Sequence, residues 1–209
     1  MTNRLIYYLL FLLLTACENS PYKLAEIQSD SSLTTEFSIL DQNSISLIQR
    51  RKQQAVIEAA FSRRTSSERA HQLAEICFNK TNGSVLMPFD LAEIALVETG
   101  GHRLSSKAVS SRGALGVWQL MPRRALSHGF SPKDMLDDDK CAEAAVRELY
   151  SKLNIVKGDL ERAKRYYCGQ GPQATAYMKK IRLIRNEMMN ELTLQSSNFA
   201  SVEPATRVR

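Results

Sequence analysis

Apolar side chains recur along most of the chain at the three- and four-residue spacing of helices, and runs of β-branched residues are scarce. Glycine, proline and clusters of polar residues interrupt this spacing at intervals. The pattern predicts an all-α domain. The expected helices cover about residues 67–77, 90–99, 118–125, 140–153, 159–167 and 174–192.

Two less regular segments flank this predicted domain. Residues 18–44 are rich in Ser, Thr, Asn and Gln, which is typical of a flexible tether, and the tail from Thr193 is expected to be disordered. Residues 45–64 could form a helix whose apolar side consists of Ile48, Ala55, Ile57, Ala60 and Phe61. We interpret this helix as a solvated spacer, with a helix lying on a membrane surface as the alternative.

The first residues have the pattern of a secretory signal. Arg4 precedes the apolar run Leu5 to Leu14, which is shorter than the roughly 20 residues that a spanning helix needs. The following Leu14-Thr15-Ala16-Cys17 resembles the lipobox of bacterial lipoproteins. That resemblance implies removal of residues 1–16, attachment of acyl chains such as palmitate to Cys17, and, with Glu18 next, sorting to the outer membrane. The alternative is an ordinary signal peptide that contains a cysteine.

The charge balance suits an anionic partner. Without residues 1–16 the chain has 27 Lys and Arg against 22 Asp and Glu, a net charge of about +5. Nucleic acid, a lipid surface or the bacterial wall would fit this balance. No block of five or more basic residues is present, so nucleic acid is not specifically indicated.

Cysteine and histidine usage excludes a recognisable metal motif. Beyond Cys17 the cysteines are Cys77, Cys141 and Cys168, at spacings that match no zinc site, and none of the three histidines stands at ligand spacing to another. We therefore expect no metal and no other cofactor. An exported chain enters an oxidising compartment, so one disulfide with one thiol left over is expected, with its pairing open.

Glu98 occupies an unusual place for a carboxylate. The apolar helix that begins near Asp90 stops at Gly100-Gly101, and Glu98 is the last acidic residue before that stop. The C-terminal end of a helix carries partial negative charge, so both this position and apolar surroundings should raise the pKa of Glu98. A carboxyl group that is protonated near neutral pH can act as a general acid. The alternative is an exposed glutamate on the last helical turn.

The residues around and after Glu98 resemble the catalytic core of soluble-type (SLT) lytic transglycosylases, which are relatives of goose-type lysozyme. Three blocks in the family's order carry the resemblance: Glu98-Thr99-Gly100, then Ala108-Val109-Ser110 with the run 113–122 (GALGVWQLMP), then Tyr166-Tyr167-Cys168-Gly169 as a partial match. The resemblance covers about residues 70–190. It implies a lysozyme-like helical fold and peptidoglycan glycan strands as substrate.

The family resemblance also implies a role for individual residues. Glu98 would be the sole catalytic acid and base, and Tyr167 would orient its carboxyl group. Ser110 and Gln119 would hydrogen-bond the substrate near the cleavage point. Met121 would line the cleft. The remaining expectations concern the loop between these residues: Gly113 and Gly116 would let sugars approach the backbone, and Trp118 would either stack on a sugar or pack in the core.

The chain departs from the family pattern at three places. The stretch between Glu98 and Ser110 is about three residues longer than usual and contains His102 and Arg103. Asparagine is common in the family at the positions of Cys141 and Cys168. Because both asparagines are replaced by cysteine, the resemblance suggests a Cys141–Cys168 disulfide, with a Cys77–Cys141 bond or three free thiols as alternatives.

Together these features divide the chain into four segments: a lipoprotein signal peptide (1–16), a lipidated tether with a possible helix (17–66), a catalytic domain (67–192) and a tail (193–209). The expected activity is cleavage of the β-1,4 bond after N-acetylmuramic acid with formation of a 1,6-anhydro end. The alternatives are a muramidase that uses water and a non-catalytic wall-binding lipoprotein. Expected partners are peptidoglycan and, through the lipid anchor, a membrane facing the periplasm. An envelope-spanning machine that needs an opening in the wall is a further candidate partner.

Overall fold

The computed structural model describes the backbone of residues 31–200 and the side chains of residues 46–197. The predicted signal peptide and Cys17 lie outside the described residues. The chain separates into two units, residues 1–38 and 39–209, and of the first unit only the start of α1 is described. The helices are α1 (Ser31–Ser62), α2 (Ser67–Thr81), α3 (Pro88–Thr99), α4 (Pro122–Ser127), α5 (Asp138–Ile155), α6 (Leu160–Cys168) and α7 (Pro172–Ala200), with 3-10 turns η1 (Gly100–His102) and η2 (Pro132–Leu136).

The all-α prediction is confirmed. Within the described part, β-type pairing is limited to isolated bridges of Leu115 with Val109 and with Leu120. Helix ends follow local signals: the Ser66 side chain accepts a hydrogen bond from the backbone N–H of Arg69, and Asp159 does the same for Arg162. None of the helices among the described residues is long and apolar enough to cross a membrane.

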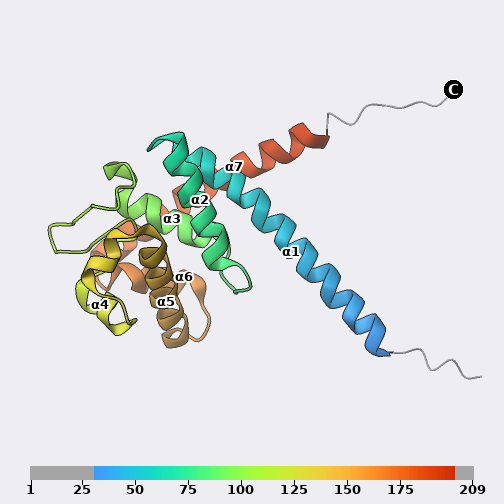
Figure 1. Ribbon diagram of the computed structural model, residues 1–209, viewed down its shortest axis with the longest axis horizontal. Coiled ribbons are helices and arrows are strands. Elements are labelled where there is room, and N and C mark those ends of the chain that lie inside the picture. Colours follow the sequence, from blue (N-terminus) through green and yellow to red (C-terminus); the bar gives the residue numbers. More distant parts are fainter. Residues whose placement is uncertain (1–30, 201–209) are drawn as a thin grey trace, which may run out of the picture. The chain divides into compact units, whose positions relative to one another are not determined.

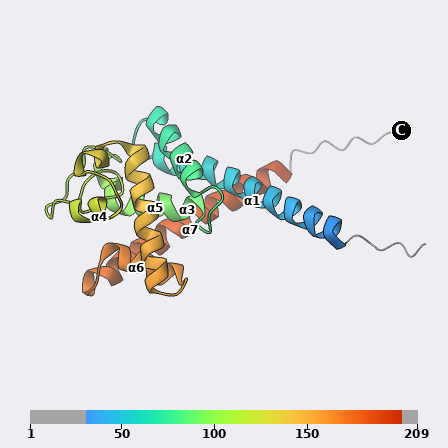
Figure 2. The same ribbon diagram turned by 60° about the horizontal axis from the view of Figure 1, so that its bottom comes forward.

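Helix α3 is the central element of the domain. It packs against α2, α5 and α7, and Figures 1 and 2 show it among these helices in both views. Its length is set by proline at the start and by Gly100-Gly101 after the end. Leu91 and Ile94 are fully buried, and they fix the helix that carries Glu98 in the core.

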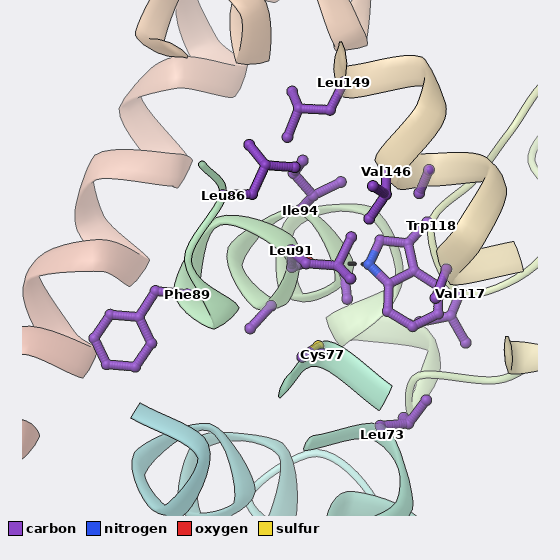
Figure 3. Close-up of a cluster of buried hydrophobic side chains, with 14 of the residues drawn as sticks. Leu73, Cys77, Leu86, Phe89, Leu91, Ile94, Val117, Trp118, Val146 and Leu149 are labelled. Carbon is purple, nitrogen blue, oxygen red and sulfur yellow. Dashed lines mark hydrogen bonds between the residues drawn. The ribbon is translucent and has the colours of Figure 1, made fainter. Parts of the chain in front are cut away.

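Trp118 fills the space between α3 and α5. Its side chain is 0% exposed, and its indole N–H donates to the carbonyl oxygen of Leu91 at 2.9 Å. Figure 3 shows the ring beside Val117 and facing Leu91, with Val146 of α5 close by. Of the two expected roles for Trp118, the structure therefore supports core packing and not stacking on a sugar.

The start of the domain lies earlier than the predicted boundary at residue 66. Val56, Ile57 and Phe61 of α1 are fully buried in the hydrophobic core. The guanidinium group of Arg50 is buried as well, and it donates to the carbonyl oxygens of Thr81, Ser84 and Leu86. The segment 45–64 is thus not a solvated spacer, because Ile57, Ala60 and Phe61 of its expected apolar side pack onto the domain, while Ile48 and Ala55 are exposed.

The end of the domain also differs from the prediction. Helix α7 does not stop before Thr193 but continues to Ala200. The polar side chains that made the tail look disordered are accommodated on the helix, since the hydroxyl groups of Thr193 and Ser196 donate to the carbonyl oxygens of Met189 and Leu192, one turn earlier.

Candidate active site

Glu98 lies on the last turn of α3, beside the loop that follows the helix. The predicted helix stop is confirmed, since α3 ends at Thr99 and is followed by the short turn η1. The buried Thr99 hydroxyl donates to Val117 O at 2.8 Å and to Ala95 O at 3.2 Å. This contact joins the end of α3 to the glycine-containing loop, so the position of Glu98 is fixed from both sides.

The Glu98 carboxyl group is half-buried, and burial raises its pKa to about 7. A hydrogen-bonding contact with Tyr177 and the positive charge of Lys180 oppose this rise. The predicted direction of the pKa shift is therefore confirmed, with burial as the cause. At neutral pH the group is close to half protonated, which suits a residue that must both donate and accept a proton.

Tyr177 is the aromatic partner of Glu98, and sequence inspection missed it. It comes from α7, is 7% exposed, and its hydroxyl group approaches the Glu98 carboxyl. The contact is looser than an ordinary hydrogen bond, because this buried hydroxyl has no partner of standard geometry in the described structure. The sequence feature that could have indicated this contact is a tyrosine on the buried side of a helix that is otherwise rich in basic residues.

Tyr167 lies near Glu98 but does not hold its carboxyl group by a hydrogen bond. Burial and the neighbouring charge of Glu98 raise the pKa of Tyr167 well above its ordinary value. Its hydroxyl group donates to Trp118 O at 2.8 Å. Tyr167 thus ties α6 to the loop that contains Trp118, and the hydroxyl group that approaches the Glu98 carboxyl is that of Tyr177.

Ser110 and Gln119 shape the loop that faces the site. The Ser110 hydroxyl oxygen accepts a hydrogen bond from the backbone N–H of Ala114 at 2.9 Å, which closes a tight turn. The Gln119 amide group donates to Gly116 O at 2.8 Å and to Ala108 O at 3.2 Å. Gln119 has φ +51°, an uncommon conformation for a residue with a side chain, and such strain is frequent at functional sites.

One cavity of about 210 Å³ gathers three of the predicted site residues, Gln119, Met121 and Tyr167. Glu98 and Ser110 are not among its lining residues. The prediction that Met121 faces the cleft is consistent with this arrangement, and its side chain is 42% exposed. The lining also includes Leu120, Tyr166, Cys168 and Gly169 from the motif blocks. Three further lining residues were not singled out from the sequence, and these are Arg124, Glu148 and Lys152.

The two loop glycines have different surroundings, and the expectation that sugars approach the backbone at both of them is wrong for Gly116. Gly113 (φ +81°) has open space around it, as a surface approached by a ligand would need. Gly116 (φ +75°) is instead buried against the chain: a Cβ there would overlap the carbonyl oxygen of Met135 and lie 2.8 Å from the Cys141 sulfur. Gly116 is needed for packing, and no sugar can approach it.

We expect Gly116→Ala to be far more destabilising than Gly113→Ala. Both changes place a side chain at positive φ, which costs about 1–2 kcal/mol, but only the first also overlaps backbone, which adds about 1–3 kcal/mol. Urea denaturation should show the difference in the free energy of unfolding. Equal losses in the two variants would contradict the assigned role of Gly116.

The suggested Cys141–Cys168 disulfide is absent from the structure, in which Cys77, Cys141 and Cys168 are all free thiols. Cys141 is buried at the start of α5, where burial raises its pKa to about 12 and its sulfur packs against Gly116. Cys168 is exposed at the end of α6. The replacement of two family asparagines by cysteine therefore does not reflect a bond between them in this structure.

Buried ion pairs fix the helices that carry the site. Lys164 of α6 and Arg185 of α7 both contact Asp90 and Glu93 of α3, with Lys164 Nζ 2.7 Å from Asp90 and Arg185 Nε 2.6 Å from Glu93. The Glu93 side chain is fully buried. Because removing one partner would leave a buried charge unpaired, this cluster holds the register between α3 and α7, and hence between Glu98 and Tyr177.

Comparison with known proteins gives one match. The family model described as "Transglycosylase SLT domain" matches residues 76–187, which is more than half of the chain and contains α3, the glycine loop, α5, α6 and the first half of α7. No curated protein and no solved structure matched the chain.

Proposed function

The chain belongs to the transglycosylase SLT domain family, and from this premise we propose that it is a peptidoglycan lytic transglycosylase in which Glu98 is the single catalytic acid and base. The family supplies the substrate, peptidoglycan. The proposed reaction is cleavage of the β-1,4 bond between N-acetylmuramic acid and N-acetylglucosamine, with formation of a 1,6-anhydro end. The observation that carries the proposal is the half-buried Glu98 carboxyl group, whose pKa is raised to about 7.

Glu98 would act twice in one turnover. The protonated carboxyl group first gives its proton to the glycosidic oxygen, the bond from that oxygen to C1 breaks, and the carbonyl oxygen of the sugar's own N-acetyl group bonds to C1. The Glu98 carboxylate then takes the proton of the 6-hydroxyl group, O6 bonds to C1, and the bond to the N-acetyl oxygen breaks. Glu98 ends protonated, and no water is consumed.

Tyr177 and Lys180 would support the first proton transfer of this cycle. Both lower the pKa of Glu98, against the effect of burial, and so they stabilise the carboxylate that forms after the first proton transfer. Without them burial would raise the pKa of Glu98 further, and the carboxyl group would give up its proton to the glycosidic oxygen less readily. Tyr167, bonded to the loop backbone, would keep that loop and α6 in fixed relation.

A muramidase would need a group that activates water, and Glu148 is the carboxylate that lines the cavity of Gln119, Met121 and Tyr167. Its two oxygens are already occupied, one by His128 Nε2 at 2.7 Å and the other by Lys152 Nζ at 2.9 Å. A carboxylate held in this way is a weak base. The arrangement thus favours the anhydro product over hydrolysis.

The product mass tests the proposal. Purified protein should release from isolated peptidoglycan sacculi muropeptides that end in 1,6-anhydromuramic acid, which mass spectrometry distinguishes from hydrolysis products because they are one water molecule lighter. Reducing-end muropeptides instead would assign a muramidase. No released muropeptides at all would favour the non-catalytic wall-binding protein.

We further propose that the protein is a lipoprotein anchored at Cys17 in the outer membrane and facing the periplasm. The support is the sequence Leu14-Thr15-Ala16-Cys17 after an apolar run. Cys17→Ala should remove the lipid attachment site, so that the protein no longer incorporates labelled palmitate and no longer fractionates with the outer membrane. A Cys17→Ala variant that is still acylated and membrane-bound would overturn the lipobox assignment.

A further inference from the structure

The chain leaves α3 just after Glu98 through a strained turn. Arg103 and Leu104 are consecutive residues in the left-handed conformation, with φ of +56° and +52°. Residues other than glycine, asparagine and aspartate rarely adopt this conformation, so it persists only where the surrounding contacts impose it. The Leu104 side chain is fully buried, and its backbone N–H donates to Thr99 O at 3.0 Å. The turn therefore folds back onto the residue next to Glu98.

The contact that holds this turn comes from Arg69 of α2. Its Nε and Nη2 atoms both donate to the carbonyl oxygen of Leu104, with Nε at 2.9 Å. Its Nη1 and Nη2 atoms also donate to the two carboxylate oxygens of Asp138, at 2.8 and 3.1 Å. Asp138 lies in the first turn of α5, where the helix dipole favours an acidic side chain. Arg69 thus connects α2 and α5 to the turn that follows Glu98.

The ion pair of Arg69 and Asp138 acts on Glu98 only through the backbone. Neither residue lines the cavity that contains Gln119, and neither is among the groups that shift the pKa of Glu98. The two opposite charges also cancel one another. The side chains are 25% and 20% exposed, so the pair is partly shielded from water. Its influence on Glu98 passes through the Leu104 carbonyl group and the hydrogen bond from Leu104 to the end of α3.

We propose that Arg69, held by Asp138, is a positioning residue: it maintains the strained turn at Arg103 and Leu104 and thereby fixes the position of the Glu98 carboxyl group. The inference rests on the proposed function of Glu98. Without Arg69 the turn would relax to ordinary backbone conformations, and the backbone that follows Glu98 would shift. A displacement of about 1 Å at a catalytic group can lower the rate by about 100-fold.

A relaxed turn would also change the surroundings of the Glu98 carboxyl group. Burial is the cause of its raised pKa, so water that reaches the group more easily would lower that pKa towards the ordinary value. Because Arg69 and Asp138 do not act on the pKa of Glu98 by their own charges, such a shift would report a movement of Glu98.

The test measures kcat, KM and the pH profile of kcat/KM for release of anhydromuropeptides by the full-length protein. In Arg69→Met the side chain keeps an apolar stem but loses its donors. We expect kcat to fall by about 10- to 100-fold with KM nearly unchanged, as for a change in the geometry of the reacting groups. The alkaline limb of the profile should move to lower pH. Arg69→Lys keeps a charged donor and should recover part of both effects.

Arg50→Met is the matched control. Arg50 likewise donates to backbone carbonyl oxygens of a loop, those of Thr81, Ser84 and Leu86. That loop precedes the start of α3, whereas Glu98 lies at the other end of the helix. Arg50→Met should therefore be less resistant to urea than wild type, but its folded molecules should keep the wild-type kcat and the wild-type alkaline limb.

The position of the alkaline limb decides between a positioning role and a merely structural one. A wild-type limb in Arg69→Met would overturn the inference even if activity fell, because a loss of folded protein lowers activity without moving the limb. A limb that moves equally in Arg50→Met would also overturn it. If Arg69→Met does not fold, a wild-type limb in Arg69→Lys would overturn it. Wild type that releases no anhydromuropeptides would instead overturn the proposed function.

Discussion

Glu98→Gln should lower the rate of anhydromuropeptide release by about 10³- to 10⁴-fold. General acid–base catalysis typically contributes about 10²–10⁴-fold, and here one residue supplies both the acid and the base. The glutamine side chain keeps the shape of glutamate but can neither protonate the glycosidic oxygen nor accept the proton of the 6-hydroxyl group. The loss should fall on kcat, with KM nearly unchanged, as expected for an interaction made in the transition state.

Two measurements separate this effect from damage to the fold. Glu75→Gln, the same chemical change at an exposed position of α2, should keep full activity. Glu98→Gln should be at least as resistant to urea as wild type at pH 8, because burying an ionised carboxyl group is costly and an amide avoids that cost. If Glu98→Gln retained more than a tenth of the wild-type activity, Glu98 would not be the catalytic residue.

The fold could be predicted from sequence wherever local signals set it. Capping residues and the Gly100-Gly101 stop placed α2, α3 and α6 close to their observed bounds. The two ends of the domain could not be placed in this way. The sequence pattern indicates a solvated spacer at residues 45–64 and a disordered tail from Thr193, whereas Phe61 is fully buried and α7 continues past Thr193. Burial of this kind depends on tertiary packing, which composition does not report.

The candidate site was predictable as far as sequence motifs reach. They located Glu98, Gln119, Met121 and Tyr167, and a simple electrostatic argument gave the direction of the Glu98 pKa shift. The contact from Tyr177 escaped prediction because it lies 79 positions further along the chain and reaches Glu98 only through the packing of α7 on α3.

At Gly116 and the cysteines, the family motif predicted contacts that the structure does not contain. Because Gly116 belongs to a family motif, it was expected to let the substrate approach the backbone. Because cysteine replaces two family asparagines, a disulfide between them was expected. The structure contradicts both expectations at the same place, because the Cys141 sulfur occupies the space beside Gly116. Residue type alone did not distinguish a close approach by substrate from a close approach by the protein's own core.

The reaction should slow by about tenfold for each pH unit above about 7. The first step requires a protonated Glu98, whose pKa is raised to about 7 by burial, and the protonated fraction falls tenfold per unit above that value. Between pH 7, where about half of Glu98 is protonated, and pH 9 the loss of kcat/KM should therefore be about fiftyfold. A glutamate with the ordinary pKa of 4.5 would already be ionised at pH 7, and its alkaline limb would lie more than two units lower.

Lys180→Gln tests whether this limb belongs to Glu98. The positive charge of Lys180 lowers the pKa of Glu98, so its removal should raise that pKa further and move the alkaline limb to higher pH. Lys179→Gln, at the adjacent exposed position, is the control and should leave the limb in place, because Lys179 is not among the groups that shift Glu98. The readout is the pH profile of kcat/KM, which reports the free enzyme. A limb that stays fixed in Lys180→Gln, or a profile that is flat to pH 9, would show that Glu98 is not the titrating acid.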